Sequence, residues 1–133
     1  MVVVNLLWRH NMENKAFEIS EAELEVIKVL WKTDKPMTAQ EVCDTVVNKE
    51  WKYTTASTLL SRLVEKGAVA YKKKGKSYLY YPIIKKEDYK QSQTKNLVSK
   101  LYDGSVKNLA VSLFKAGEMS AEDIEEIKKM FNL

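Results

Sequence analysis

The chain has 133 residues, of which 45% are hydrophobic and 30% are charged, and its formal net charge is +4 at pH 7. This length fits one domain or two very small ones, and a half of about 60 residues would be marginally stable alone, which favours an oligomer. A single cysteine, Cys43, excludes an intramolecular disulfide and fits a reducing cytosol, and no stretch approaches the roughly 20 apolar residues of a membrane helix.

The charge is unevenly distributed along the sequence. Between Lys52 and Lys90 there are ten basic residues against three acidic ones, hence a local net charge of +7. Acidic residues outnumber basic ones after Glu118. This uneven distribution of charge predicts a basic part that faces DNA and an acidic part with another role.

Residues 1–12 show no helical or strand period, and we expect a disordered extension there. Its apolar start, MVVVNLLW, is short and lacks the basic lead and small-residue cleavage site of a signal peptide. We therefore predict a cytoplasmic protein without membrane insertion.

Two capping boxes predict the first two helices. Ser20 to Glu23 opens a helix with Leu24, Ile27, Leu30 and Trp31 on its apolar face, which ends at Thr33-Asp34-Lys35-Pro36. Thr38 to Glu41 opens a shorter helix with Val42, Val46 and Val47 facing inward.

The next stretch predicts a third helix over residues 54–66, capped near Tyr53-Thr54 and ended by Gly67. Leu59, Leu60, Leu63 and Val64 form its apolar face, and the candidate DNA-contacting residues lie mostly on other faces: Thr54, Thr55, Ser57, Thr58 and Arg62. Threonine can touch a thymine methyl group, and arginine can bind guanine or phosphate. The alternative is an ordinary surface helix with a polar face.

A basic hairpin is predicted directly after this helix. β-favouring residues flank the turn Lys73-Lys74-Gly75-Lys76, so residues 71–78 read as a wing whose lysines grip phosphates: Lys72, Lys73, Lys74 and Lys76. The alternative is a solvated hairpin tip in which charge protects a sheet edge. Three short helices followed by a hairpin predict a winged helix-turn-helix domain over residues 13–84, in a mainly α (α+β) chain.

Other candidate chemistry is sparse. Trp51 is interpreted as a core plug, with a phosphate contact as its alternative, and Trp31 as a core residue. Cys43 is interpreted as an inert buried cysteine, because the sequence shows no metal-ligand spacing. We find no catalytic motif, and we expect neither an enzyme nor a cofactor nor a metal.

Residues 85–133 are predicted to form a helical dimerisation domain. Helices are expected at about 86–101 and 105–115 and after Ser120, with apolar stripes too few to enclose a core. A symmetric dimer would bury these stripes. The predicted dimer residues are Leu97, Leu101, Leu109, Leu113, Phe114, Ile124, Ile127 and Phe131.

The chain resembles the BlaI/MecI/CopY family of bacterial repressors from Glu13 to about Met130. The matching pieces are MENKAFEISEAELEVIKVLW, YTTASTLLSRLVEKG, KKKGKSYLYYPI and KLYDGSVKNLAVSLFKAGEMSAEDIEEIKKM. The resemblance implies a homodimeric repressor of β-lactam-resistance genes that binds a palindromic operator. It implies base reading by Thr55, Ser57 and Thr58, with Arg62 near the backbone.

The resemblance also implies a mode of release. In the β-lactam branch a membrane sensor protease signals, and the repressor is cut in its dimerisation helix; the matching bond here joins Ser112 to Leu113. The β-lactam repressors carry a basic residue where Ser57 stands, and the copper branch carries CxC motifs that this chain lacks. Two alternatives are a winged-helix regulator of a different regulon, released by another signal, and a winged helix that docks proteins.

Overall fold

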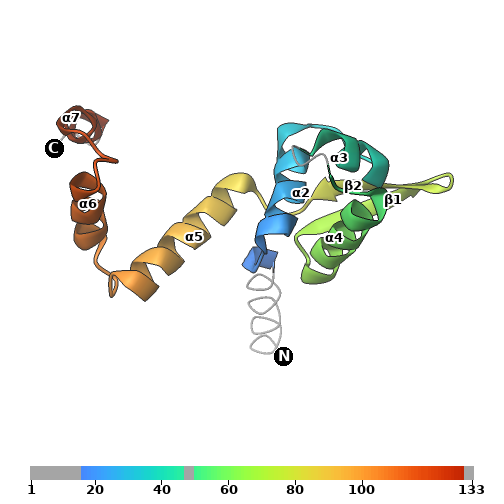
Figure 1. Ribbon diagram of the computed structural model, residues 1–133, viewed down its shortest axis with the longest axis horizontal. Coiled ribbons are helices and arrows are strands. Elements are labelled where there is room, and N and C mark those ends of the chain that lie inside the picture. The colour runs from blue at the N-terminus through green and yellow to red at the C-terminus, as the bar shows by residue number, and fades with distance from the viewer. Residues whose placement is uncertain (1–15, 47–49, 131–133) are drawn as a thin grey trace, which may run out of the picture. The chain divides into compact units, whose positions relative to one another are not determined.

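A computed structural model describes residues 16–46 and 50–130 of the chain (Figure 1). The chain divides into two compact units, residues 1–90 and residues 91–133. The predicted extension over residues 1–12, Val47 and Phe131 lie outside the described residues. Among the helices described, none is both long and apolar enough to cross a bilayer.

The first two helices begin at the predicted capping boxes. α2 (Glu21–Lys32) is capped by Ser20, whose hydroxyl accepts from the Glu23 amide while the Glu23 carboxylate accepts from the Ser20 amide. α3 (Ala39–Thr45) repeats this exchange between Thr38 and Glu41. Each box satisfies two backbone amides that the helix itself leaves free, so the start of each helix is set locally.

The start of α4 (Tyr53–Lys66) differs from the prediction. Its N-cap residue is Lys52, which makes no side-chain cap, so the cap expected at Tyr53-Thr54 is wrong. Tyr53 and Thr54 are already helical because the amides of Thr55 and Ala56 donate to the Lys52 carbonyl. The helix ends as predicted at Gly67, whose φ of 83° suits a residue without a Cβ.

The predicted hairpin is present. β1 (Val69–Lys74) pairs antiparallel with β2 (Ser77–Pro82), and Gly75 and Lys76 form a two-residue turn. Gly75 has a φ of 64°, which primed hairpin turns require at their first position. In Figure 1 the hairpin tip projects past the helices of its unit.

One core joins the three helices to the base of the hairpin. It contains Val26, Ile27 and Leu30 of α2, Val42 of α3, Leu59, Leu60 and Leu63 of α4, and Val69 and Tyr80 of the strands. Tyr80 also exchanges two backbone hydrogen bonds with Met37, of 2.7 and 2.9 Å, which ties the α2–α3 loop to β2. Three helices closed by a hairpin form a winged helix-turn-helix, and the predicted fold class is confirmed.

Trp31 and Trp51 behave as core residues. Trp31 packs on the core, donates its indole N–H to the Ile84 carbonyl (3.0 Å) and lies 5.8 Å from the Tyr89 ring. Trp51 also packs on the core, so the plug interpretation is confirmed. Cys43 is half-buried rather than fully buried, and its thiol donates to the Trp51 carbonyl (3.4 Å).

The remaining helices are α5 (Lys86–Leu101), α6 (Val106–Lys115) and α7 (Ala121–Met130). The predicted caps of the last two are present, since Ser105 accepts from the Asn108 amide and Ser120 from the Asp123 amide. No described residue of α6 or α7 is buried. α6 and α7 thus leave their apolar side chains at least partly in contact with solvent.

Candidate nucleic-acid interface

α4 separates an apolar face from a polar one. Ala56, Leu59, Leu60 and Leu63 are buried against α2, α3 and β1. Of the predicted DNA contacts on this helix, Ser57 is half-buried and the others are exposed: Thr54, Thr55, Thr58 and Arg62. Arg62 has no carboxylate partner within the described residues, so its charge is free for a ligand.

The hairpin supplies a second exposed cationic element. All four predicted wing lysines are exposed, and none forms an ion pair with any residue that the structure describes. The strand register divides them, because directly paired residues share a face. Lys73 pairs with Tyr78 and lies on the face of Tyr71 and Tyr80, whereas Lys72 and Lys74 lie on the other face.

Tyrosines stiffen the first of these faces. The Tyr71 and Tyr78 rings meet edge to face at 4.9 Å, and the Tyr71 and Tyr80 rings lie 5.9 Å apart. Burial, followed by the neighbouring phenols of Tyr53, Tyr71 and Tyr78, raises the pKa of Tyr80. Tyr80 therefore stays protonated and neutral at pH 7.

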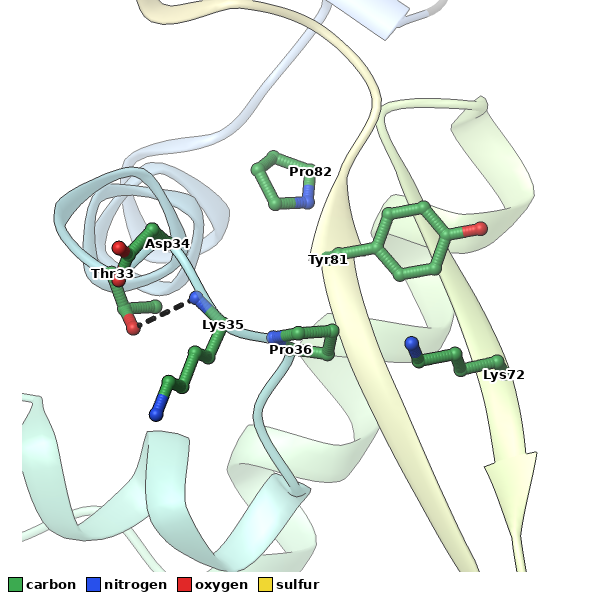
Figure 2. Close-up of a pocket in the computed structure, with 7 residues that line it drawn as sticks. All are labelled: Thr33, Asp34, Lys35, Pro36, Lys72, Tyr81 and Pro82. Carbon is green, nitrogen blue, oxygen red and sulfur yellow. Dashed lines mark hydrogen bonds between the residues drawn. The ribbon is translucent and has the colours of Figure 1, made fainter.

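Two hollows flank the hairpin. The recognition-side hollow, of about 330 Å³, is lined by the start of α3, by Tyr53 at the start of α4, and by Lys76, Ser77 and Tyr78 of the wing. The loop-side hollow, of about 420 Å³, lies between the loop Thr33–Pro36 and Lys72, Tyr81 and Pro82 (Figure 2). The recognition-side hollow thus joins the start of α3, the start of α4 and the wing tip in one concave surface.

Sequence reasoning missed an ion pair that fixes the end of α4. Lys66 binds the carboxylate of Glu23 at 2.5 Å and the carbonyl of Glu18 at 2.7 Å. Burial raises the pKa of Glu23 most strongly, but hydrogen bonds from Lys66 and Ser20 together outweigh it and hold the pKa below its usual value. Glu23 is 2% exposed, and its second oxygen has no partner among the described groups. The sequence showed Glu23 only as a capping residue, because its partner lies 43 positions away.

The predicted dimer residues keep large apolar surfaces in the second unit. Leu97, Leu101, Leu113, Phe114 and Ile127 are exposed, and Leu109 and Ile124 are half-buried. The Ser112–Leu113 bond lies inside α6, and the Ser112 hydroxyl accepts a hydrogen bond from the Tyr102 hydroxyl at 3.0 Å. Across the described ranges, no cluster of His, Cys, Asp and Glu side chains could hold a metal ion.

The fold and its exposed basic elements define a winged-helix DNA-binding protein. The sequence profile of the penicillinase repressor family matches residues 19–132. The methicillin resistance regulatory protein MecI of Staphylococcus aureus (strain N315) is 33% identical over 122 residues, which are 91% of this chain and 98% of that protein. The penicillinase repressor of Bacillus licheniformis is 31% identical over 110 residues, which are 83% and 86% of the two chains.

Among solved structures, the DNA-binding domain of the repressor BlaI is similar to this chain, and the matched region covers 54% of this chain and 88% of that domain. It is 40% identical in sequence, with a TM-score of 0.48. On the profile match and the curated relatives, the chain belongs to the penicillinase repressor family. Members of this family are transcriptional repressors and not enzymes.

Proposed function

We propose that this protein is a homodimeric repressor that binds a palindromic operator through α4 and the wing. The observation that carries the proposal is the exposed polar face of α4 beside an unpaired cationic hairpin. Arg62 and the wing lysines have no anionic partner among the described residues. Lys66, which is also on α4, instead forms an ion pair with Glu23. Free cations on one surface provide the electrostatic attraction that nucleic-acid binding requires.

The two elements have different chemical roles. Thr55 and Thr58 are exposed on a helix that would enter the major groove, where hydroxyl and methyl groups can meet base edges. Arg62, further along the helix, would bind a guanine edge or the backbone. The wing lysines would bind flanking phosphates, which adds affinity without reading sequence.

Dimerisation would couple two such surfaces. The exposed apolar residues of the second unit, among them Leu101 and Phe114, would be buried against a second copy. Two recognition helices would then enter successive major grooves about 34–36 Å apart, or a multiple of that spacing. Binding of the first half-site would raise the effective concentration of the second.

The proposal extends to the genes that the repressor controls and to the signal that releases it from DNA. Relatives named for methicillin resistance and penicillinase repression point to β-lactam-resistance genes or related ones. Cleavage between Ser112 and Leu113 by a sensor protease would interrupt α6 and weaken the dimer. The cut would thereby lower operator affinity without touching the winged helix.

A titration by fluorescence anisotropy tests the repressor proposal. The full chain is added to duplexes that tile the DNA upstream of its own gene, and to scrambled duplexes of equal length. We expect one tile to bind at least about a thousandfold more tightly than its scrambled form, as specific protein–DNA complexes do. Equal affinity for every duplex would contradict sequence-specific repression, and no DNA binding at all would favour a protein-docking winged helix.

A further inference from the structure

Tyr89 attaches the first turn of α5 to the winged helix. Its ring is buried and contacts two other aromatic rings, stacking on Phe17 with a centroid distance of 6.5 Å and lying 5.8 Å from Trp31. Phe17 precedes α2, and Trp31 belongs to the last turn of that helix. Over residues 86–97, all of which the structure describes, no other residue of α5 is buried. The side-chain attachment of this stretch therefore depends on one ring.

Backbone hydrogen bonds connect the same turn to the end of α4. The Ala68 amide donates to the Leu63 carbonyl of α4 at 3.0 Å, and the Ala68 carbonyl accepts from the amides of Ile83 and Ile84 at 2.8 and 3.3 Å. The Ile84 carbonyl in turn accepts the indole N–H of Trp31 at 3.0 Å. Because α5 starts directly after this linker, its first turn is held in a fixed relation to the helix that would read DNA.

The length of α5 enlarges the effect of any movement at this attachment. From Tyr89 to its end at Leu101 the helix extends about 18 Å, at 1.5 Å per residue. A tilt of about 10° at Tyr89 would displace the far end by about 3 Å, which is close to the rise of one base pair, about 3.4 Å. Leu97 and Leu101, near this far end, are among the exposed apolar residues assigned to the dimer. The Tyr89 contact can therefore influence the distance between two DNA-reading surfaces.

We propose that Tyr89 is a positioning residue that fixes which spacing between half-sites the dimer accepts. This inference rests on the proposed function and deepens it. α4 and the wing read each half-site, and the Tyr89 contact sets the distance at which two half-sites are read together. With the ring in place, one spacing is strongly favoured. Without the ring, α5 pivots at its first turn, and neighbouring spacings are accepted at a smaller loss of affinity.

Operators of altered spacing test this role. The starting probe is the tightest-binding upstream duplex, and its derivatives carry one or two base pairs inserted between the half-sites; a further duplex carries one half-site alone. Each inserted base pair moves the second half-site by about 3.4 Å and rotates it by about 35° around the DNA axis. Fluorescence anisotropy of the full chain measures the ratio of the affinities for the original and the altered spacing.

We expect two inserted base pairs to weaken binding of the unmodified chain about a hundredfold, because the second half-site no longer adds to the affinity. Tyr89→Ala should lose less than about tenfold on the same insertion and should keep its affinity for the single half-site within about threefold. Tyr89→Phe keeps the ring, so this matched control should show the hundredfold loss. Phe17→Ala removes one of the two rings that contact Tyr89, and its loss should lie between those of Tyr89→Ala and the unmodified chain.

An equal spacing penalty in Tyr89→Ala and in the unmodified chain would overturn the proposal. If Tyr89→Ala lost affinity equally on every duplex, the single half-site included, impaired folding would be the cause and Phe17→Ala would decide: a reduced spacing penalty supports the proposal, and an unreduced one overturns it. An unmodified chain that tolerates both insertions would also overturn it, while leaving the repressor proposal intact. The proposed function itself would fail if the unmodified chain bound two half-sites no more tightly than one.

Discussion

Two basic residues one turn apart on α4 have opposite surroundings. Arg62 is exposed without a carboxylate partner in the described part of the chain, whereas Lys66 is bound to buried Glu23 and to a carbonyl oxygen. The spacing of four residues places both on adjacent turns, and the sequence alone gives them the same chemical type. Tertiary contacts therefore decide that one cation is available to DNA and the other holds the fold together.

Arg62→Ala should weaken operator binding by about 1–3 kcal/mol without unfolding the protein, because it removes an exposed contact to DNA. Anisotropy titrations over a salt series measure the binding change. Urea unfolding provides the control, and we expect the free energy of unfolding to change by less than about 0.5 kcal/mol. Unaltered binding with an unaltered salt slope would exclude Arg62 from the interface.

Lys66→Met should instead lower the free energy of unfolding by about 3 kcal/mol, since it leaves the Glu23 charge buried without its partner. Lys28→Met is a matched control, because Lys28 and Glu25 form an exposed pair at 3.7 Å that should contribute less than about 1 kcal/mol. Urea unfolding of the three proteins at pH 7 measures the difference. Similar losses in both variants would contradict the special role of the buried pair.

The same pair predicts a pH dependence. The folded-state pKa of Glu23 lies below its usual value of 4.5, so the unfolded chain binds this proton more readily. The stabilisation by ionised Glu23 is complete above pH 4.5 and is lost as the pH falls through the folded-state pKa. The stability difference between the unmodified protein and Glu23→Gln should therefore shrink below pH 4.5. A difference that stays constant from pH 7 to pH 3 would contradict this assignment.

At the scale of elements, contacts between residues close in sequence could be predicted, and contacts between residues far apart in sequence could not. The capping boxes at Ser20 and Thr38 involve residues three apart, and both are present. The expected cap of α4 failed because this helix starts on backbone hydrogen bonds to Lys52 rather than on a side chain. The recognition-side hollow is lined by Tyr53 of α4 and Tyr78 of β2. The periodicity of a single segment cannot predict that side chains from two elements lie close together.

A side chain at Gly75 in the wing turn should destabilise the protein through backbone strain and not through a steric clash. A Cβ at Gly75 would meet no atom within 4 Å, but the φ of 64° costs other residues about 1–2 kcal/mol. We expect Gly75→Ala to lower the free energy of unfolding by about 1 kcal/mol and to reduce the salt slope of DNA binding, because the wing lysines shift. Gly104→Ala carries similar strain in the second unit, with a φ of 82°, and should leave the slope intact. An unchanged slope in Gly75→Ala would show that the wing does not depend on this turn.

At the scale of the whole molecule, the two units differ in how they bury apolar residues. The first unit encloses a core of its own, and α6 and α7 have no buried residue. The apolar stripes of the second unit were predictable from helical periodicity, but the partner that covers them was not, because no sequence pattern within one chain specifies it. The predicted division at residues 84 and 85 stays a prediction, beside the compact units 1–90 and 91–133.

Phe114→Asp should raise the dimer dissociation constant strongly, since a large exposed aromatic residue of this kind contributes about 2–4 kcal/mol when it anchors an interface. Sedimentation equilibrium measures the change. Lys115→Ala, at a neighbouring exposed position, is the control and should leave the dissociation constant within about threefold. An unmodified chain that remains monomeric at high concentration would contradict the proposed dimer.

Hydroxyl-radical footprinting on the tightest-binding upstream duplex tests most directly whether α4 and the wing act as one surface presented twice. The account predicts two protected patches related by a twofold axis and separated by one helical turn or a multiple of it, each flanked by backbone protection that disappears when the four wing lysines are replaced by glutamine. A single unsymmetrical patch, or flanks that survive the loss of the four lysines, would contradict it.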